Sequence, residues 1–297
     1  MPQAQANNIT IEYDTFGDQQ KPAMLLIMGL GAQMIHWDVD FCNQLASEGF
    51  YVIRFDNRDV GLSSKMDGES VPELSKMVLD LMSGKTPKVP YSIDDMAADA
   101  MGLLDVLGIQ QAHICGASMG GMIAQLVACH YPERALSLTS IMSTTGSPDL
   151  PKSTAEAQEA LSAPRPDSEE EVVKRAQSNA LILGSPGFEK DAEFIARRAL
   201  EAFRRSFYPM GFARQVAAIV VAGDRRVKLQ KLTLPSLVIH GTDDPLVPVQ
   251  GGHDTHENIV GSKLELIEGM GHDLPKGAWN RIISSITNLT LKETEST

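Results

Sequence analysis

Short apolar segments recur along this chain between longer segments with helical spacing. Six of them are predicted as buried β-strands, because each is a run of mostly apolar or β-branched residues bounded by turn residues. These runs cover 23–28, 51–55, 112–115, 136–142, 236–240 and 263–267. A seventh segment, 9–16, alternates apolar and polar residues and is predicted as part of an antiparallel edge. Strands that alternate with helices predict a mostly parallel sheet flanked by helices, the α/β class.

Two segments between these runs show clear helical periodicity. In 92–107, apolar residues recur every three or four positions, and Gly108 follows as a helix-ending signal. A second helix is predicted over 119–130, and it stops shortly before Pro132. Both segments can serve as crossover helices between parallel strands.

The alternation of strands and helices breaks between about 147 and 234. Prolines at 148, 151, 164 and 166 punctuate the start of this segment. From 167 to 231 the pattern is helical, with acidic residues in its first turn and turns predicted at 184–187 and 209–211. We therefore predict an α/β core formed by 1–146 and 235–297, with a helical cap at 147–234. Such a cap would cover the carboxyl edge of the sheet, where open α/β sheets bind ligands.

The net charge of the chain argues against some classes of binding partner. Lys and Arg total 26 against 38 Asp and Glu, which gives a formal charge of −12. This balance argues against a nucleic-acid partner and against docking on anionic lipid. Apolar residues make up 43% of the 297 residues, and a chain of this length can bury a core that needs no disulfide or structural metal.

Cysteine usage and the N-terminus bear on the compartment. Cys42, Cys115 and Cys129 show neither pairing nor metal-binding spacing, which is typical of reduced thiols. The polar N-terminal residues lack the features of a signal peptide, and no apolar run approaches the ~20 residues that span a bilayer. We therefore expect a cytoplasmic protein.

The most informative motif is Gly116-Ala-Ser118-Met-Gly120, a G-x-S-x-G sequence between a predicted strand and a predicted helix. In this position the motif is typical of a nucleophile elbow, a sharp turn that presents a reactive serine. Glycines are needed at both flanks because a Cβ there would clash with the neighbouring strand and helix. The alternative is a small-residue turn that holds an inert serine. We predict that Ser118 is a nucleophile.

A nucleophilic serine requires a base, and the base requires an orienting acid. The strand at 236–240 is followed by a turn with two candidate acids, Asp243 and Asp244. We favour Asp244, because prolines at 245 and 248 fix the loop just after it. The alternative is a turn aspartate that caps the next helix. The candidate base is His272, in a glycine-rich loop after the last predicted strand, from which it could reach Ser118.

The remaining histidines fit structural roles. His253 and His256 have i, i+3 spacing, but no third ligand motif accompanies them. We interpret them as a solvated helix face and predict no metal site. His36 lies in a loop near the sheet edge, where it could line a pocket.

The chain order Ser118, Asp244, His272 and the surrounding loops resemble the α/β-hydrolase fold superfamily, from about residue 9 to residue 289. The segment from Asp56 to Ser63 resembles the family's D-x-R-x-x-G-x-S loop, which is structural there. Within the superfamily the chain is most similar to the cofactor-free haloperoxidase and esterase group, which includes the aclacinomycin methylesterase type. The helical insertion resembles that group's cap.

The resemblance implies an oxyanion hole made of two backbone N–H groups. One belongs to Met119, the residue after the nucleophile, and the other is assigned to Leu30 in the loop after 23–28. The family usually has His-Gly-x in this loop, whereas this chain has Met28-Gly29-Leu30. Because the donor is a backbone group, the hole can survive this change, and Gly29 stays open as the alternative donor.

These features predict a serine esterase that needs no cofactor or metal and acts on small to medium esters through an acyl-enzyme. A serine at the elbow argues against the dehalogenase and epoxide hydrolase branches, whose nucleophile is a carboxylate. A lactonase, a carbon–carbon bond hydrolase, or a ligand-binding protein with little turnover stays open. The expected partner is a small-molecule ester, with no nucleic acid and no membrane, and a homo-oligomer stays open.

The cap is expected to determine substrate choice. Seven of its side chains could line an apolar acyl pocket or, alternatively, pack the cap onto the core. They are Phe188, Phe194, Phe203, Phe207, Tyr208, Met210 and Phe212.

Overall fold

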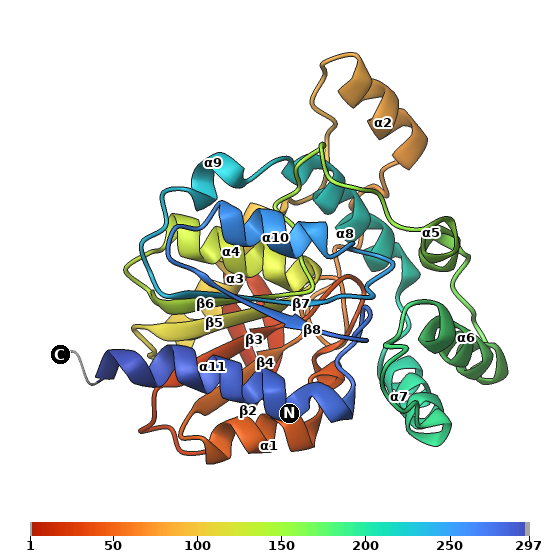
Figure 1. Cartoon of the computed structure of the whole chain (residues 1–297). Helices are drawn as coiled ribbons and strands as arrows, with labels where there is room; N and C mark the ends of the chain where they lie inside the picture. The colour runs from red at the N-terminus through yellow and green to blue at the C-terminus, as the bar shows by residue number, and fades with distance from the viewer. Residues whose placement is uncertain (1, 295–297) are drawn as a thin grey trace.

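An eight-stranded sheet lies at the centre of the computed structural model, which describes residues 2–294 (Figure 1). Its strands run in the order β1-β2-β4-β3-β5-β6-β7-β8. They are β1 (Gln3–Ala6), β2 (Ile9–Phe16), β3 (Ala23–Ile27), β4 (Tyr51–Phe55), β5 (Ala112–Ala117), β6 (Ala135–Ile141), β7 (Ser236–Gly241) and β8 (Lys263–Ile267). β2 pairs antiparallel with β1 and β4, and the other pairs are parallel. The predicted mostly parallel sheet is confirmed.

All seven predicted strands form, with ends that differ from the prediction by at most two residues. The 9–16 segment pairs antiparallel with β4, as expected, and β1 extends this edge by one more strand. The prediction omits β1 because its sequence, Gln-Ala-Gln-Ala, has little β-propensity. Pairing with β2 and the burial of Ala4 and Ala6 make it a strand.

Helices cover both faces of the sheet (Figure 1). The helices outside the insertion are α1 (Val39–Ser47), α2 (Leu74–Met82), α3 (Ile93–Val106), α4 (Met119–His130), α10 (Gln250–Glu257) and α11 (Trp279–Thr294), with short 3-10 helices at Met34–His36 and Lys276–Ala278. Leu25 of β3 packs in the core cluster that contains α3 and α4 residues, whereas Leu26 packs in the cluster that contains α1 and α11 residues. The central strand is therefore apolar on both faces, as in a buried parallel sheet.

The two predicted crossover helices form at the expected positions. Ser92 caps α3, because its hydroxyl accepts from the Asp95 N–H while the Asp95 carboxylate accepts from the Ser92 N–H. Gly108 follows α3 with a φ of +70°, a left-handed conformation that glycine adopts without a Cβ clash. α4 spans the predicted residues 119–130.

The insertion between β6 and β7, described in full, folds into five helices. They are α5 (Ala155–Ser162), α6 (Glu169–Ile182), α7 (Ala192–Arg205), α8 (Pro209–Ala222) and α9 (Arg226–Leu229). The first three lie to one side of the sheet, on the right in Figure 1. The prediction omits α5, whose start is capped by the Thr154 hydroxyl. The division into a core and a separate cap domain stays a prediction.

One predicted turn in the insertion is confirmed and one is wrong. The turn at 184–187 separates α6 from α7. The turn predicted at 209–211 does not form, because α8 begins at Pro209 and the chain breaks instead at 206–208. Proline is favoured at the first helical position, where its missing N–H would have no intrahelical partner.

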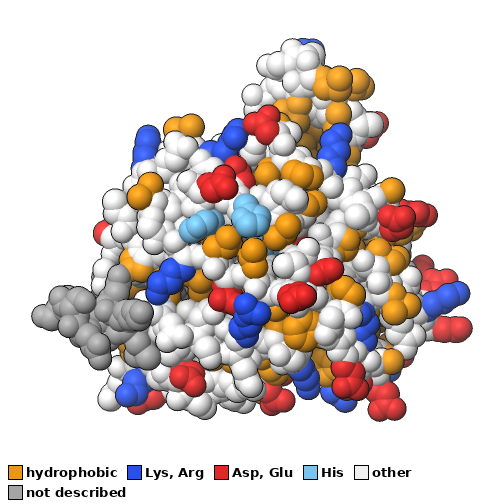
Figure 2. Space-filling model, viewed as in Figure 1, with side chains coloured by type: hydrophobic (Ala, Val, Ile, Leu, Met, Phe, Trp, Pro, Cys, Tyr) orange, Lys and Arg blue, Asp and Glu red, His pale blue; other side chains and the backbone are white. Residues whose placement is uncertain are grey.

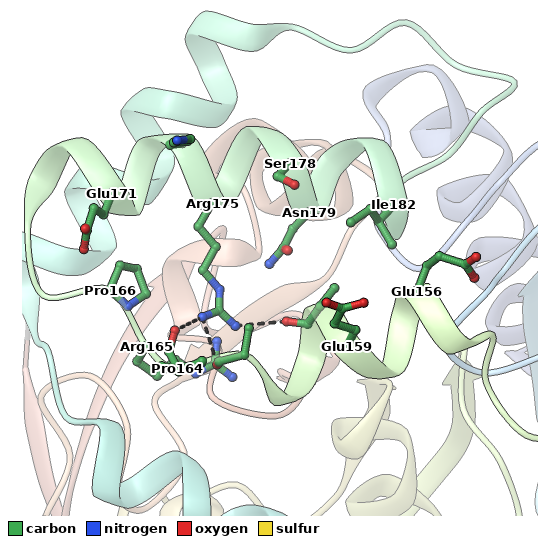
Figure 3. Close-up of a pocket in the computed structure, with 13 residues that line it drawn as sticks. Glu156, Glu159, Pro164, Arg165, Pro166, Glu171, Arg175, Ser178, Asn179 and Ile182 are labelled. Atoms are coloured by element: carbon green, nitrogen blue, oxygen red, sulfur yellow. Dashed lines mark hydrogen bonds between the residues drawn. The ribbon is translucent and has the colours of Figure 1, made fainter.

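A single arginine joins α5 to α6. The Arg175 guanidinium donates hydrogen bonds to the carbonyl oxygens of Ala160 and Ala163, at 3.0 Å each, and of Pro164 (Figure 3). These carbonyls lie at the end of α5, where the last turn of a helix leaves acceptors without intrahelical donors. Arg175 therefore fixes the position of α5 on α6.

The helix α2 projects from the rest of the molecule (Figure 1). Apolar side chains gather on this projection (Figure 2), and Leu79 and Met82 are 66% and 81% exposed. Within residues 2–294, no helix is both long and apolar enough to cross a membrane.

Candidate active site

The turn between β5 and α4 presents Ser118 at the carboxyl edge of the sheet. Ser118 has φ +57° and ψ −121°, a strained conformation for a residue with a Cβ. A Cβ on Gly116 would lie 2.0 Å from the Gly120 carbonyl oxygen, and one on Gly120 would lie 2.1 Å from that of Ile27. The turn can be this tight only because both flanking residues are glycines, as the sequence predicts.

The structure brings Ser118, His272 and Asp244 together from the loops after three different strands, β5, β8 and β7. His272 Nε2 lies 2.9 Å from Ser118 Oγ, and His272 Nδ1 lies 2.7 Å from Asp244 Oδ2. The Asp244 side chain is fully buried, and that of His272 is 9% exposed. A neutral imidazole with its proton on Nδ1 can donate to the carboxylate and accept the hydroxyl proton at Nε2.

The structure separates the two candidate acids. Asp244 Oδ1 accepts from the N–H groups of Leu246 and Val247, at 2.9 and 2.8 Å, which leaves Oδ2 directed at His272. Asp243 is exposed, and its carboxylate accepts from the N–H of Gly269 at 3.0 Å. The favoured residue, Asp244, therefore contacts the imidazole, and it also stabilises its own turn.

A second imidazole lies near Asp244. His240 Nε2 is 2.8 Å from the Val247 carbonyl oxygen and 3.6 Å from Asp244 Oδ2. Burial lowers the pKa of His240, so the ring is neutral and donates from Nε2 to the carbonyl. A second histidine beside the acid is not predicted, because nothing in the sequence pattern around β7 indicates it.

The loop after β3 lies against Ser118. A Cβ on Gly29 would lie 3.1 Å from Ser118 Cβ and 3.6 Å from its Oγ. Within the described residues, the N–H groups of Leu30 and Met119 donate to no other protein group. Both are therefore free to donate to a bound molecule, and the choice between Leu30 and Gly29 as a donor stays a prediction.

Three side chains hold this loop in place. Asn57 Nδ2 donates to the Met28 carbonyl at 2.9 Å, and Asp56 Oδ1 accepts from the Met34 N–H at 2.8 Å. From α8, the fully buried Gln215 accepts from the Gly31 N–H at 2.8 Å. A structural role is expected for the loop that begins at Asp56. Gln215 cannot be identified from a local pattern, because it is 184 residues from its partner.

A cavity of about 470 Å³ opens beside Ser118 and His272. Its walls are mostly apolar and include Met28, Met119, Met122 and Met142. His36 lines it, as the sequence suggests.

The seven cap side chains that are candidates for an acyl pocket in the sequence do not line this cavity. Phe203, Phe207, Tyr208 and Phe212 line a different pocket, of about 240 Å³. The Ser118 cavity is lined instead by aliphatic side chains of the insertion, such as Leu161 and Ile219.

Residues 183–187 of the insertion form hydrogen bonds with residues 269–273, the loop that carries His272. We call this contact the clasp. The His272 N–H donates to the Leu183 carbonyl at 2.7 Å, and the Gly271 N–H donates to Ser185 Oγ at 2.9 Å. The Ser185 hydroxyl in turn donates to the Asp273 carboxylate, which also accepts from the Ser185 N–H at 3.0 Å. The position of His272 therefore depends on the insertion.

The other predicted histidines lie elsewhere. His253 and His256 are both on α10, and His256 Nδ1 pairs with the Ser262 hydroxyl at 2.8 Å. Among the described residues, no group of three His, Cys, Asp or Glu side chains has the arrangement of a metal site.

Comparison with known proteins agrees with this architecture. Residues 22–275 match the family model described as alpha/beta hydrolase fold. The chain is 31% identical over 265 residues to 3-oxoadipate enol-lactonase 2 of Acinetobacter baylyi, which covers 89% of this chain and 86% of that one. It is 28% identical over 301 residues to a rhodomycin D methylesterase of Streptomyces peucetius, with 94% of each chain covered.

A solved structure shows the same fold. A meta-cleavage product hydrolase from Pseudomonas fluorescens superimposes with a TM-score of 0.77 over 99% of this chain and 98% of that one. Its sequence identity is 19%, so this likeness concerns the fold alone.

Proposed function

Because the chain belongs to the α/β hydrolase fold family, we propose that it is a serine hydrolase of carboxylic esters with Ser118, His272 and Asp244 as its catalytic triad. The observation that carries this proposal is the pair of hydrogen bonds that link Ser118 Oγ to His272 Nε2 and His272 Nδ1 to Asp244 Oδ2. Relatives named as a methylesterase and an enol-lactonase support cleavage of ester bonds in general.

In the acylation step, Ser118 Oγ attacks the ester carbonyl carbon while its proton moves to His272 Nε2. Asp244 holds the proton of the imidazole on Nδ1 and stabilises the imidazolium. The carbonyl oxygen becomes an oxyanion, which accepts from the N–H groups of Met119 and Leu30. Each such donor contributes roughly 3–4 kcal/mol of transition-state stabilisation. Collapse of the intermediate breaks the ester C–O bond, and the leaving alkoxide takes the proton from His272.

In the deacylation step, a water molecule attacks the acyl-enzyme and passes its proton to His272 Nε2. The second tetrahedral intermediate collapses, the proton returns to Ser118 Oγ, and the carboxylic acid leaves. The cycle consumes one water and needs no electron transfer, because each step is a substitution at the carbonyl carbon or a proton transfer through His272.

A lactone is a cyclic ester, so the same residues would open it with the alcohol still attached to the acyl group. The identity of 31% to an enol-lactonase favours lactones as a second substrate class. Product analysis separates the classes, since a simple ester yields two molecules and a lactone yields one.

The proposal is tested by fluorophosphonate labelling combined with a substrate panel. We expect the probe to modify Ser118, because an activated serine attacks phosphorus as it attacks a carbonyl. The panel contains 4-nitrophenyl esters of increasing chain length, methyl esters and lactones. Failure of the folded protein to react with the probe, together with binding of panel compounds without turnover, would contradict the proposal and favour a ligand-binding protein.

Ser185 is expected to act as a positioning residue through the clasp. Ser185→Ala removes the hydroxyl that joins Gly271 to Asp273, so His272 loses part of its support. We expect kcat to fall about 10-fold with little change in KM, because Ser185 does not line the cavity. Steady-state kinetics and the melting temperature are measured together.

The matched control is Ser178→Ala, an exposed serine on α6 of the same insertion. It should leave kcat unchanged, and Ser185→Thr should restore much of the lost kcat, since it returns the hydroxyl. An equal loss in Ser178→Ala, or an unchanged kcat in Ser185→Ala, would refute the positioning role.

A further inference from the structure

Among the residues that the structure describes, no lysine or arginine lines the cavity beside Ser118. Of the residues that line it, His36, His272 and Asp273 are ionisable. We propose that the cavity selects esters whose acyl group carries no negative charge, and that Asp273 contributes to the exclusion of anions. This inference rests on the proposed ester hydrolysis and adds the class of substrate.

The positively charged side chains near the cavity are already bound to other protein groups. Arg198 pairs with Asp38 at 2.5 Å, and the Lys190 ammonium donates to the Ser185 carbonyl at 2.7 Å. Neither side chain is part of the cavity wall. A carboxylate that entered the cavity would therefore find no ready counter-charge.

Two arginines line a separate groove between α5 and α6, and their guanidinium groups contact residues of the insertion. Arg165 and Arg175 line the groove drawn in Figure 3, which is distinct from the cavity at Ser118. Arg175 is bound to the carbonyls at the end of α5, and the Arg165 guanidinium stacks on the Phe212 ring at 3.5 Å. These guanidinium groups are held in place by the insertion itself.

The surroundings of His36 and Asp273 explain why the cavity would bind an anionic acyl group more weakly than a neutral one. Burial lowers the pKa of His36, so this imidazole is uncharged and offers no compensating charge. Burial raises the pKa of the Asp273 carboxyl, and the hydrogen bonds from the Ser185 hydroxyl and N–H, followed by the nearby charge of Lys190, oppose this rise. At the pH of the test, the Asp273 carboxylate repels an anion, and the neutral His36 does not offset this repulsion.

Desolvation makes this arrangement selective. A carboxylate that leaves water for an apolar wall without a partner loses its hydration and gains no ion pair. An uncharged acyl chain of the same length loses only weak hydration and packs on the methionines of the wall. The expected discrimination is therefore large, about 100-fold or more in kcat/KM.

The test compares two esters with the same adipoyl chain at pH 8 and follows the release of 4-nitrophenolate. One is methyl 4-nitrophenyl adipate, which is neutral, and the other is mono-4-nitrophenyl adipate, whose free carboxylate is ionised. We expect the wild-type protein to favour the neutral ester by about 100-fold or more in kcat/KM. A ratio near one would overturn the proposal.

Asp273→Asn tests the part assigned to this carboxylate. We expect the neutral-to-anionic ratio to fall several-fold, about 10-fold at most, because a charge is removed while the shape and the apolar wall remain. Asp167→Asn, an exposed position in the insertion, makes the same change of net charge and should leave the ratio as in the wild type. An unchanged ratio in Asp273→Asn would overturn the role of Asp273.

A third measurement separates the inference from the proposed function. Ser118→Ala is assayed on the neutral ester. If this activity persists, ester hydrolysis by the triad is wrong. If it disappears while the wild type cleaves both esters equally well, the catalytic proposal stands and the charge selection alone is wrong.

Discussion

Ser118→Ala is expected to lower kcat on 4-nitrophenyl butyrate by about 10⁴-fold or more. The variant keeps the strained turn and the free N–H groups of Leu30 and Met119, but it has no oxygen to attack the carbonyl. Residual hydrolysis above the rate in water would come from these donors and from substrate binding. Initial rates at saturating substrate, with the melting temperature measured in parallel, provide the readout.

The control for this first prediction is a double variant, because the effects of removing Ser118 and His272 should not add. Because Ser118 and His272 act on the same proton, the Ser118→Ala/His272→Ala double variant should be no slower than either single variant by more than a few-fold. Ser178→Ala should match the wild type. A Ser118→Ala protein that retains activity within about 10-fold of the wild type would exclude Ser118 as the nucleophile.

Asp244→Asn is expected to lower kcat by about 10³–10⁴-fold, whereas Asp243→Asn should change it by less than about 3-fold. In Asp244→Asn the amide oxygen can still accept from the Leu246 and Val247 N–H groups, so the amide nitrogen faces His272. A donor at that place forces the imidazole proton onto Nε2, and this tautomer cannot accept the proton of Ser118.

The exposed neighbour is the matched control for this second prediction, because it makes the same chemical change one residue away. Asp243 accepts from the Gly269 N–H, and an asparagine can keep that bond. Discontinuous assays at several pH values would show whether the kcat of Asp244→Asn recovers as the concentration of hydroxide rises. If Asp243→Asn were the slow variant and Asp244→Asn the active one, the assignment of the acid would be reversed.

Local patterns explain why the sheet and the elbow can be predicted from the sequence. The strands are apolar runs bounded by turn residues, and β3, β5 and β7 are buried on both faces, so their signal does not depend on distant partners. The elbow depends on Gly116 and Gly120, whose lack of a Cβ is a property of the sequence itself. Ser118, Asp244 and His272 each follow a predicted strand, and parallel strands bring such loops to one edge.

Long-range contacts explain what could not be predicted. β1 exists because of its pairing with β2, since its own residues have little strand preference. Gln215 and Ser185 support the active-site loops through hydrogen bonds to residues 184 and 86 positions away, which no local pattern reveals. The aromatic residues of the insertion are apolar in any fold, and only the structure shows that they line a pocket other than the one at Ser118.

The close approach of two glycines in the clasp limits how the protein can be re-engineered. The Gly187 N–H donates to the Gly269 carbonyl at 2.9 Å, and a Cβ on Gly187 would lie 2.7 Å from the Gly269 Cα. Libraries that diversify this junction would displace the loop that carries His272 and yield mostly inactive clones. Diversity aimed at new substrates belongs instead at wall positions such as Leu161 and Ile219, which face the cavity from α5 and α8.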